Sequence, residues 1–435
     1  MLTPNIDGLA EEGLVFHSAH NQLAVCGPSR NSFLTGRRPD TTKVYVNSDF
    51  FRDVGGNFST IPQYFLENGY LTFGSGKVFH GNNNDNQYSW TENCFRSTTD
   101  DFWESDGLSW AIVEPEEYEE TPLPDMEIRD YGLDKLRFVA NESMPFFVAI
   151  GFKRPHLPFK VPRVFYEMYA EEDMFLPSNP YVPSNLPELA WGSWGDMKYY
   201  VDIEEYDPSY NSTLPDSKTL ELRRGYYASV SYVDFMVGEI LQELEDLKLK
   251  DTTAVLLTSD HGYHLGEHAG WAKSTNYELD TRIPMILKIP GFSPSETVVE
   301  EFVELVDVFP TLADVVGLNP VALCPENSTF IKVCTEGRSI LQSLETGLWK
   351  DAAFSQFRRN NNMGHAIHTK EYSYSRWMPL TNGEIQDWDR VNAEELYDLI
   401  RDPDQTANLA GFPEYADMQA EAAERLKANW RAALP

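Results

Sequence analysis

The chain has 435 residues, and its 35 basic and 68 acidic side chains give a formal charge of −33. A hydrophobic fraction of 42% excludes a disordered chain, because such chains lack the apolar surface that offsets the entropy of ordering. The excess of carboxylates excludes a general nucleic-acid binder, and the longest apolar run, 144–152, is far shorter than the ~20 residues that span a bilayer. We therefore expect a soluble, acidic, multi-domain protein with no nucleic-acid partner and no membrane segment.

The first half of the chain shows strand-like and helix-like patterns in turn. Residues 1–7 lack the charged and apolar regions of a signal peptide. Residues 67–77 indicate the end of a helix, a glycine stop and a short strand. Residues 100–130 hold twelve carboxylates against one basic residue, which predicts a solvated surface excursion. The apolar run 146–152 predicts a strand buried on both faces.

The second half continues this pattern. Residues 170–220 are rich in Pro, Ser and Asp and predict a second large loop region. An amphipathic helix is predicted where apolar residues recur at spacings of three and four, at Val230, Val233, Val237, Leu241, Leu244 and Leu247. The strand expected at 252–257 runs into Ser259-Asp260-His261-Gly262. Because α/β sheets bind ligands beyond the carboxyl ends of their strands, we expect a functional cluster there.

After about residue 350 the pattern changes to short alternating segments. The segment 365–376 predicts an antiparallel hairpin, and hence a small terminal α+β unit. The four cysteines are too few for a disulfide scaffold. Cys324 and Cys334 flank one short loop and could close a local bridge, which would suit an oxidising compartment. Cys94 has no obvious partner, and we expect an unpaired buried thiol.

The strongest chemical signal is Cys26-Gly-Pro-Ser-Arg30 followed by Leu34-Thr-Gly36. Further motifs occur along the chain at Thr3-Pro-Asn-Ile-Asp7, Gly76-Lys-Val-Phe-His80, Arg154-Pro-His156, Thr258-Ser-Asp-His-Gly262, Glu395-Leu-Tyr-Asp398 and Asp402-Pro. Together they resemble the sulfatase family, whose Cys-x-Pro-Ser-Arg element directs conversion of the cysteine to formylglycine. The segments 36–42, 57–63 and 266–273 are similar to the iduronate-2-sulfatase branch of that family. The Cys324–Cys334 pair also resembles a disulfide of that branch.

The resemblance implies a fold and an activity. The fold is that of sulfatases and alkaline phosphatases, in the α/β class. A large, mostly parallel sheet between helices is expected over residues 1–349, and a smaller antiparallel subdomain over residues 350–435. The activity is removal of a 2-O-sulfate from a uronic acid of a sulfated glycan. The formylglycine-generating enzyme would be a partner, and the protein would be secreted or lysosomal.

The chemistry of sulfate esters agrees with these residue types. Hydrolysis needs a nucleophile for sulfur, neutralisation of charge on the sulfate oxygens and a proton for the leaving alcohol. Residue 26, as a hydrated aldehyde, would attack with one hydroxyl and expel sulfate with the other. The resemblance implies that Arg30 orients and stabilises this group. The residues that would contact the sulfate or protonate the leaving oxygen are Lys77, His80, His156 and Lys273. One Ca²⁺ per chain would be held by Asp260, His261 and Cys26 in its modified form.

Plainer interpretations stand beside these roles. Asp260 could merely cap a helix, and Lys77 and Lys273 could be surface charges with partly buried stems. His264 and His268 have the i, i+4 spacing of a zinc pair, but their glycine-rich surroundings make structural histidines the expectation.

One departure from the family concerns the beginning of the chain. Sulfatases carry an upstream strand that ends in paired aspartates, and these supply two carboxylates to the cation. This chain begins with Met1-Leu-Thr-Pro, so we expect weak metal binding and an exposed edge on a neighbouring strand. A truncated gene model and a catalytically impaired, sulfated-glycan-binding homologue both fit this departure. A sulfatase of another algal or marine polysaccharide, or a phosphate or phosphonate ester hydrolase, are further alternatives.

The charge distribution gives a last expectation. Residues 26–80 contain six basic and four acidic residues, whereas carboxylates concentrate elsewhere. We therefore predict a local positive funnel within an acidic shell, formed by Arg30, Arg37, Arg38, Lys77, Lys153 and Lys273.

Overall fold

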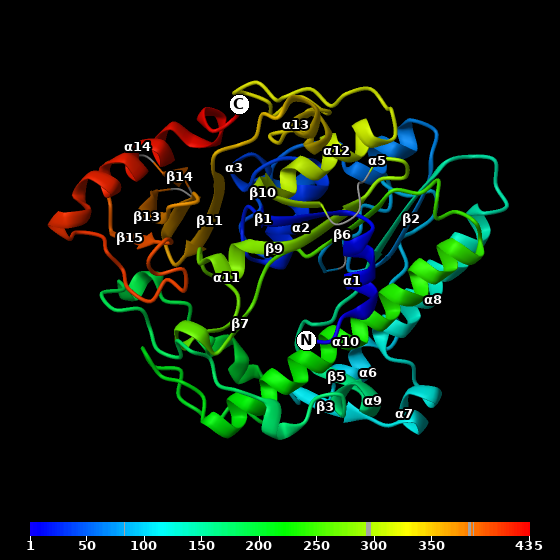
Figure 1. Cartoon of the computed structure of the whole chain (residues 1–435), viewed down its shortest axis with the longest axis horizontal. Helices are drawn as coiled ribbons and strands as arrows, with labels where there is room; N and C mark the ends of the chain where they lie inside the picture. Colours follow the sequence, from blue (N-terminus) through cyan, green and yellow to red (C-terminus); the bar gives the residue numbers. More distant parts are fainter. Residues whose placement is uncertain (82, 293–296, 382–383, 386) are drawn as a thin grey trace.

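A four-stranded mixed sheet forms the centre of the protein, in the order β10-β1-β9-β6 (Figure 1). The computed structural model describes residues 1–81, 83–292, 297–381, 384–385 and 387–435. Strand β1 (Leu14–His20) runs parallel to β10 (Thr297–Glu304) and antiparallel to β9 (Arg282–Lys288). Strand β9 also pairs antiparallel with β6 (Val255–Thr258). The predicted α/β class is thus confirmed, with an antiparallel strand inside the main sheet.

Helices cover both faces of this sheet. Leu14 and Phe16, two residues apart on β1, pack with Phe309 in one buried cluster. That face is covered by α5 (Ile61–Glu67), α12 (Val308–Val315) and α13 (Ile340–Thr346). Helix α1 (Pro4–Glu11) lies on the other face, where Ile6 lines a cavity together with Val15. Successive side chains of β1 therefore point in turn to the two helix layers on opposite faces of the sheet.

Two parallel strand pairs lie beside the central sheet. Strand β2 (Leu71–Gly76) pairs with β4 (Phe146–Gly151), and β3 (Trp110–Val113) pairs with β5 (Phe159–Pro162). Every residue of β4 and of β6 is half-buried, so the expected burial of 146–152 on both faces is wrong. Among the described residues β4 pairs with β2 alone and β6 with β9 alone. Each of these two strands has one unpaired edge, and this explains why the side chains on both of its faces are partly exposed.

The predicted helix at 230–247 is the second half of a 31-residue helix, α10 (Asp216–Asp246), drawn in green in Figure 1. Its fully buried residues include Tyr232 and Met236, whereas Val230 and Val233 are only half-buried. The predicted stripe is displaced because α10 contacts α1, α8, α9 and β5 along different parts of its surface. The carboxylate of Asp234 on α10 also accepts from the backbone N–H groups at the start of α1.

The acidic excursion and the second loop region contain more structure than predicted. Trp103 is buried, and the segment 100–130 contributes α6 (Asp100–Glu104), β3, α7 (Pro115–Glu120) and the start of α8 (Pro124–Val139). The segment 170–220 has short 3₁₀ turns, and the buried Trp194 is the first residue of one of them. The remaining short elements are α2 (Cys26–Thr35), α3 (Pro39–Thr42), α4 (Phe51–Val54), α9 (Arg163–Tyr166), α11 (Glu278–Thr281), β7 (His264–Leu265) and β8 (Trp271–Ala272).

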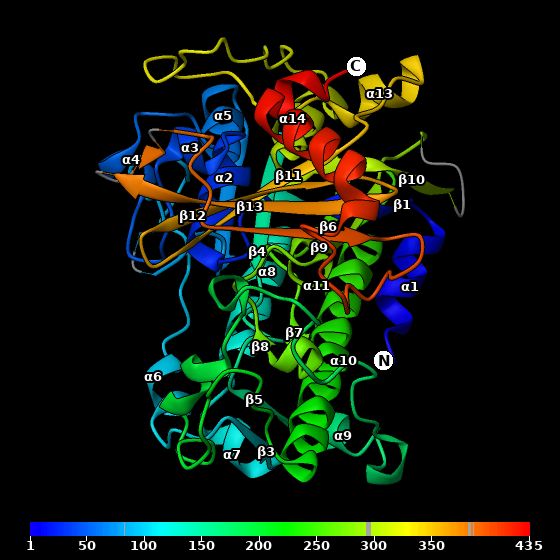
Figure 2. The ribbon, with the colours of Figure 1, turned by 90° about the vertical axis from the view of Figure 1, so that its left-hand side faces the viewer.

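The C-terminal part is an antiparallel sheet, as predicted. Its strands are β11 (Ala353–Arg359), β12 (Asn362–His368), β13 (Tyr372–Thr381), β14 (Glu384–Ile385) and β15 (Ala393–Asp398). Helix α14 (Ala416–Ala432) covers one face (Figure 2), where it packs with Tyr374, while Trp377 packs on the other face. Gly364 stands opposite Trp377, because a Cβ there would lie 2.8 Å from the indole. The boundary after residue 349 stays a prediction.

Two cysteine predictions are confirmed. Cys324 and Cys334 form a disulfide, and Cys94 is a free buried thiol. No helix in the described part of the chain is both long enough and apolar enough to cross a membrane.

Candidate active site

Helix α2 begins at Cys26, which is 1% exposed. Val25 before it is extended, so the chain turns sharply into the helix at this cysteine. The backbone N–H of Gly27 donates to Oδ1 of Asn47 at 2.8 Å. A Cβ on Gly27 would lie 3.0 Å from Asn47, so a side chain here would push the loop that carries Asn47 away from the first turn. The glycine of the motif therefore permits close packing around Cys26.

Two cationic groups flank the sulfur of Cys26. Nε2 of His261 lies 3.2 Å from Sγ, and Nζ of Lys77 lies 3.3 Å from it. Burial raises the pKa of the Cys26 thiol, but Lys77 and His261 lower it more, and the net pKa lies well below its usual value. His261 is oriented by the contact of its Nδ1 with the carbonyl oxygen of Gly262 at 2.8 Å. The position of Sγ is therefore suited to an atom that carries negative charge.

The pKa values of these flanking groups reflect the same arrangement. Burial lowers the pKa of His261, but Asp260 and Cys26 raise it more, so the net pKa is raised. Burial is the main cause of the lowered pKa of Lys77, and Cys26 and Asp260 oppose it. A negative charge on Cys26 thus raises the pKa of both His261 and Lys77.

Arg30 ties together the ends of two strands around this centre. Its Nε donates to Oδ2 of Asp260 at 2.8 Å, and its Nη1 donates to the carbonyl oxygens of Lys77 and Val78. Asp260 follows β6 and Lys77 follows β2, so one guanidinium spans both carboxyl ends. Burial raises the pKa of Asp260, but the charges of Arg30, His261 and Lys77 together lower it more, so the net pKa is lowered. The hydroxyl of Ser29 also donates to the carbonyl oxygen of Asp260 at 2.6 Å.

His156 and Lys273 form a second pair beside Cys26. Nζ of Lys273 lies 3.2 Å from Nε2 of His156, and Nδ1 of His156 lies 2.6 Å from the carbonyl oxygen of Leu157. Burial, then Lys77 and Lys273, lower the pKa of His156 to about 4. The neutral ring carries its hydrogen on Nδ1, so Nε2 accepts the hydrogen bond from Lys273.

His80 completes the set of predicted catalytic residues. Burial lowers its pKa, and Cys26, Lys77 and Arg30 are the charges that act on it. Within the described ranges, Nδ1 of His80 is buried without a hydrogen-bond partner. The structure therefore brings Arg30, Lys77, His80, His156, Asp260, His261 and Lys273 together around Cys26.

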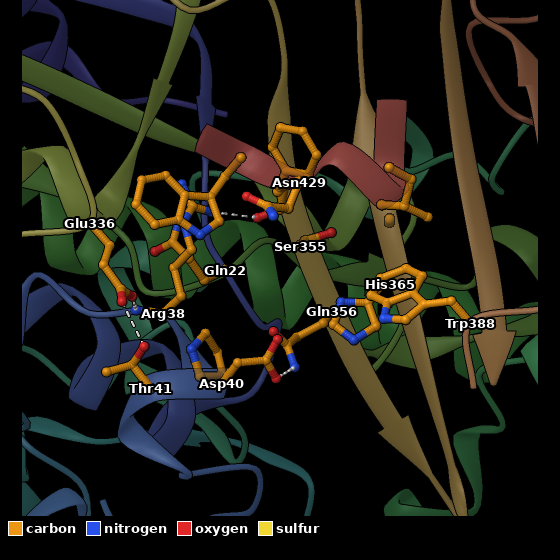
Figure 3. Close-up of a pocket in the computed structure, with 15 residues that line it drawn as sticks. Gln22, Arg38, Asp40, Thr41, Glu336, Ser355, Gln356, His365, Trp388 and Asn429 are labelled. Carbon is orange, nitrogen blue, oxygen red and sulfur yellow. Dashed lines mark hydrogen bonds between the residues drawn. The ribbon is translucent and has the colours of Figure 1, made fainter. Parts of the chain in front are cut away.

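The predicted positive funnel is only half correct. Nε of Arg37 donates to the carbonyl oxygen of Cys334 at 3.0 Å. Arg38 forms a buried ion pair with Glu304 at 2.6 Å and lines a separate cavity of about 100 Å³ that holds none of the candidate residues (Figure 3). Lys153 pairs with a carboxylate of α6 at 2.8 Å. Only Arg30, Lys77 and Lys273 converge on the candidate site, because the other three neutralise carboxylates or satisfy backbone oxygens elsewhere.

The expected metal ligands form a compact but oxygen-poor set. Cys26, Asp260 and His261 each offer one ligand atom, and these atoms lie within 4.8 Å of one another. Ca²⁺ takes six to eight oxygen ligands, whereas this set offers a single carboxylate, one oxygen of which accepts from Arg30. Taken alone, these three residues would hold Ca²⁺ only weakly.

His264 and His268 belong to a hydrogen-bonded chain. Nδ1 of His264 lies 2.7 Å from Oδ1 of Asp280, and its Nε2 lies 3.3 Å from Nδ1 of His268. Nε2 of His268 lies 2.7 Å from the carbonyl oxygen of Asp404. All four ring nitrogens have protein partners, which supports the structural interpretation.

Two contributions to the site were not predicted. Asn47 lies between the sequence motifs, and no local pattern marks it. Arg359 on β11 donates from Nη2 to the carbonyl oxygen of Ser274 at 2.6 Å, directly after Lys273. Its Nη1 donates to the carbonyl oxygen of Leu189 at 3.1 Å. The C-terminal sheet thereby fixes the loop that carries Lys273, a relationship visible only once the chain is folded.

Comparisons with known proteins agree with this geometry. The family profile described as Sulfatase matches residues 1–318, and the profile described as N-sulphoglucosamine sulphohydrolase, C-terminal, matches residues 266–432. The chain is 35% identical to iduronate 2-sulfatase of Mus musculus over 475 residues, covering 94% of this chain and 86% of that protein. Identity to iduronate 2-sulfatase of Homo sapiens is 34% over 484 residues, covering 96% and 88%.

A solved structure supports the fold. The phosphonate monoester hydrolase of Agrobacterium radiobacter superposes with a TM-score of 0.76 at 21% identity, covering all of this chain and 91% of that one. At this identity the likeness concerns the fold alone.

Proposed function

The chain belongs to the sulfatase family of hydrolases, and we propose that it removes the 2-O-sulfate of a uronic acid in a sulfated glycan. The identity with proteins named iduronate 2-sulfatase supports this substrate class. The observation that carries the proposal is the placement of buried Cys26 between His261 and Lys77, at 3.2 and 3.3 Å. Such a pair of cations neutralises charge at the atom that would bond to sulfur.

Residue 26 would act as formylglycine in its hydrated form. Sγ of Cys26 marks the place of the diol oxygens. One hydroxyl would attack the ester sulfur and release its proton to water, so that a bond from this oxygen to sulfur forms and the bond from sulfur to the sugar oxygen breaks. The sugar oxygen then takes a proton. In the second step the remaining hydroxyl loses its proton to water, the bond between the carbon of residue 26 and the sulfate oxygen breaks, and sulfate leaves as the aldehyde forms. Addition of water to the aldehyde restores the diol.

The side chains around residue 26 would have separate roles in these two steps. Lys273 would supply the proton to the sugar oxygen, and His156 would hold its ammonium in place through the 3.2 Å contact. His261 would donate a hydrogen bond from Nε2 to the second hydroxyl, because Nε2 faces residue 26, and the proton of that hydroxyl would leave to water. Lys77 and His80 would contact the sulfate oxygens. Arg30 would act through Asp260 and the backbone around Lys77, which it binds directly.

The sulfatase family generally uses formylglycine and a divalent cation. In our proposal Asp260, His261 and residue 26 hold one Ca²⁺ weakly, since they supply only one carboxylate. When bound, the cation would add positive charge beside residue 26; no proton transfer above depends on it. The formylglycine-generating enzyme would modify residue 26 in a secretory or lysosomal setting.

Mass spectrometry of the tryptic peptide 1–30 tests the modification, because Arg30 is the first basic residue. Protein made together with the formylglycine-generating enzyme should show the mass of formylglycine at residue 26. It should then release sulfate from a 2-O-sulfated uronic acid at a glycan end. An unmodified Cys26 in that preparation would exclude the catalytic proposal.

Two other candidates predict different assay results. A catalytically impaired homologue, suggested by the oxygen-poor donor set, would bind the sulfated glycan without releasing sulfate. A phosphonate or phosphate ester hydrolase would prefer a phosphate ester over the matched sulfate ester. Side-by-side assays with the two esters and a glycan-binding measurement separate all three.

A further inference from the structure

A second cluster of possible metal ligands lies where the central sheet meets the C-terminal sheet. His20 is the last residue of β1, Glu278 begins α11, and His368 ends β12. Figure 1 shows α11 beside β9 and β11 in this region. His20 and His368 are 1% and 0% exposed, and the side chain of Glu278 is 15% exposed. None of the three takes part in the chemistry proposed above.

The three side chains face a common point. Each offers one ligand atom, and these atoms lie within 4.8 Å of one another. The two imidazole rings are stacked with their centroids 5.0 Å apart. Nδ1 of His368 lies 3.0 Å from Oε1 of Glu278, yet no hydrogen bond of acceptable geometry joins Oε1 to any group in the described part of the chain. Two atoms that are close but not aimed at one another are typical of ligands around one ion.

Two buried polar atoms at this cluster indicate that it binds a ligand. Nδ1 of His20 and Oε1 of Glu278 are both buried without a hydrogen-bond partner among the residues that the structure describes. Buried polar atoms in folded proteins are nearly always satisfied by protein, water or an ion. The other carboxylate oxygen of Glu278, Oε2, lies 3.8 Å from Nε of Arg282, which leaves Oε1 as the available ligand.

A neighbouring hydroxyl orients His368. Oγ of Ser355 lies 2.9 Å from Nε2 of His368. If Nε2–H donates to this hydroxyl, the lone pair of His368 is on Nδ1, which is the atom that faces Glu278. Metal-binding histidines are usually held by such a contact on their other nitrogen. Oγ of Ser373 lies 3.3 Å from Nδ1, a longer contact that an ion would replace.

We propose that His20, Glu278 and His368 bind one Zn²⁺ ion that joins the central sheet to the C-terminal sheet. Two imidazole nitrogens and one carboxylate oxygen are a known zinc ligand set, with the fourth position left to water. Calcium is unsuited, because it requires several more oxygen ligands. Since the ligands come from β1, α11 and β12, the ion would bind the folded state and stabilise it.

Zinc titration of the full chain tests this site. The background variant Cys26→Ala/His261→Gln removes the competing donors of the candidate active site. We expect this variant to bind one equivalent of Zn²⁺, with a rise in Tm, and to give a tetrahedral absorption spectrum with Co²⁺. Adding Glu278→Gln should weaken Zn²⁺ binding at least tenfold. Adding Ser355→Ala should weaken it about tenfold, as for other residues that orient metal ligands.

His17→Gln is the matched control. This histidine also lies on β1, but its side chain is 53% exposed and contacts Glu300 at the surface. It should leave Zn²⁺ affinity and the Co²⁺ spectrum unchanged. His20→Gln provides a second ligand variant, and circular dichroism checks that each variant is folded. Failure of the background variant to bind Zn²⁺, or equal binding by folded Glu278→Gln and His20→Gln proteins, would overturn the proposal.

Discussion

Nζ of Lys273 donates a hydrogen bond to Nε2 of His156 across a sequence separation of 117 residues, at 3.2 Å. The ring is neutral near pH 7 because its pKa is lowered to about 4, first by burial and then by Lys77 and Lys273. An ammonium group has three N–H donors, and this bond uses one of them. The pair can therefore hold a proton donor in a fixed position beside residue 26.

Replacing Lys273 with Ala should reduce kcat for a sulfate ester by about 10² to 10⁴, the range for losing a positioned acid. The Tm should change little, since the side chain of Lys273 is only half-buried. Lys370→Ala is the control, because Lys370 pairs with Glu301 at the surface. Steady-state kinetics and thermal unfolding of both variants check this. Wild-type turnover in Lys273→Ala would remove Lys273 from the mechanism.

In the unmodified protein the thiol of Cys26 should ionise at a lower pH than an ordinary cysteine. Burial raises the pKa of this thiol, but Lys77 and His261 lower it more, whereas burial raises the pKa of Cys94 to about 12. Absorbance at ~240 nm during a pH titration reports the thiolate, for which ordinary cysteines need a pH near ~8.5. Lys77→Met should move the transition to higher pH, and Cys26→Ala should abolish it. A transition unaffected by Lys77→Met would contradict the electrostatic account.

Acid should destabilise the fold between pH ~6.5 and ~4. Burial is the main cause of the pKa of about 4 for His20, His156 and His268. Below pH ~6.5 the unfolded chain binds protons at these residues while the folded state does not. The free energy of unfolding therefore decreases as the pH is lowered. The loss levels off below the folded pKa and is at most about 3 kcal/mol per histidine.

Urea unfolding at several pH values in the presence of a chelator measures this dependence. His268→Gln keeps an N–H donor for the carbonyl oxygen of Asp404 and should give a shallower slope than the wild type. An equal slope in both proteins would show that His268 does not contribute.

Gly364→Ala should destabilise the C-terminal sheet. The new Cβ would lie 2.8 Å from the indole of Trp377, which is fully buried. Overpacking of this kind costs about 1 to 3 kcal/mol. Gly347→Asn is a suitable comparison, because Gly347 has a left-handed φ of 69° that Asn tolerates and no atom near its Cβ position. Equal Tm values for Gly364→Ala and wild type would mean that Trp377 can shift.

The sequence predicted the parts of the site that lie in compact motifs. Cys26 and Arg30 share one helical turn, and Asp260 and His261 follow a strand as expected for an α/β sheet. The strand after α10 and the C-terminal hairpin were found because their apolar patterns are local.

Long-range partners could not be predicted in the same way. Arg37 and Arg38 appeared to belong to a basic cluster, but their partners Cys334 and Glu304 lie more than 250 residues away. His20, Glu278 and His368 show no common pattern, because three separate elements bring them together. The half-exposure of β4 and β6 depends on which strands pair, which hydrophobicity alone does not specify.

The contact between Arg359 and Ser274 has a consequence for how the protein can be divided. Every candidate catalytic group precedes residue 274, yet the backbone next to Lys273 is anchored by a guanidinium from the C-terminal sheet. Asn276 adds a second anchor, because its side chain donates to the carbonyl oxygen of Gly364. A fragment ending near residue 350 would retain all the reactive side chains but lose their alignment. The two parts are therefore not interchangeable modules, and exchanging the C-terminal sheet between relatives would require exchanging the 273–276 loop with it.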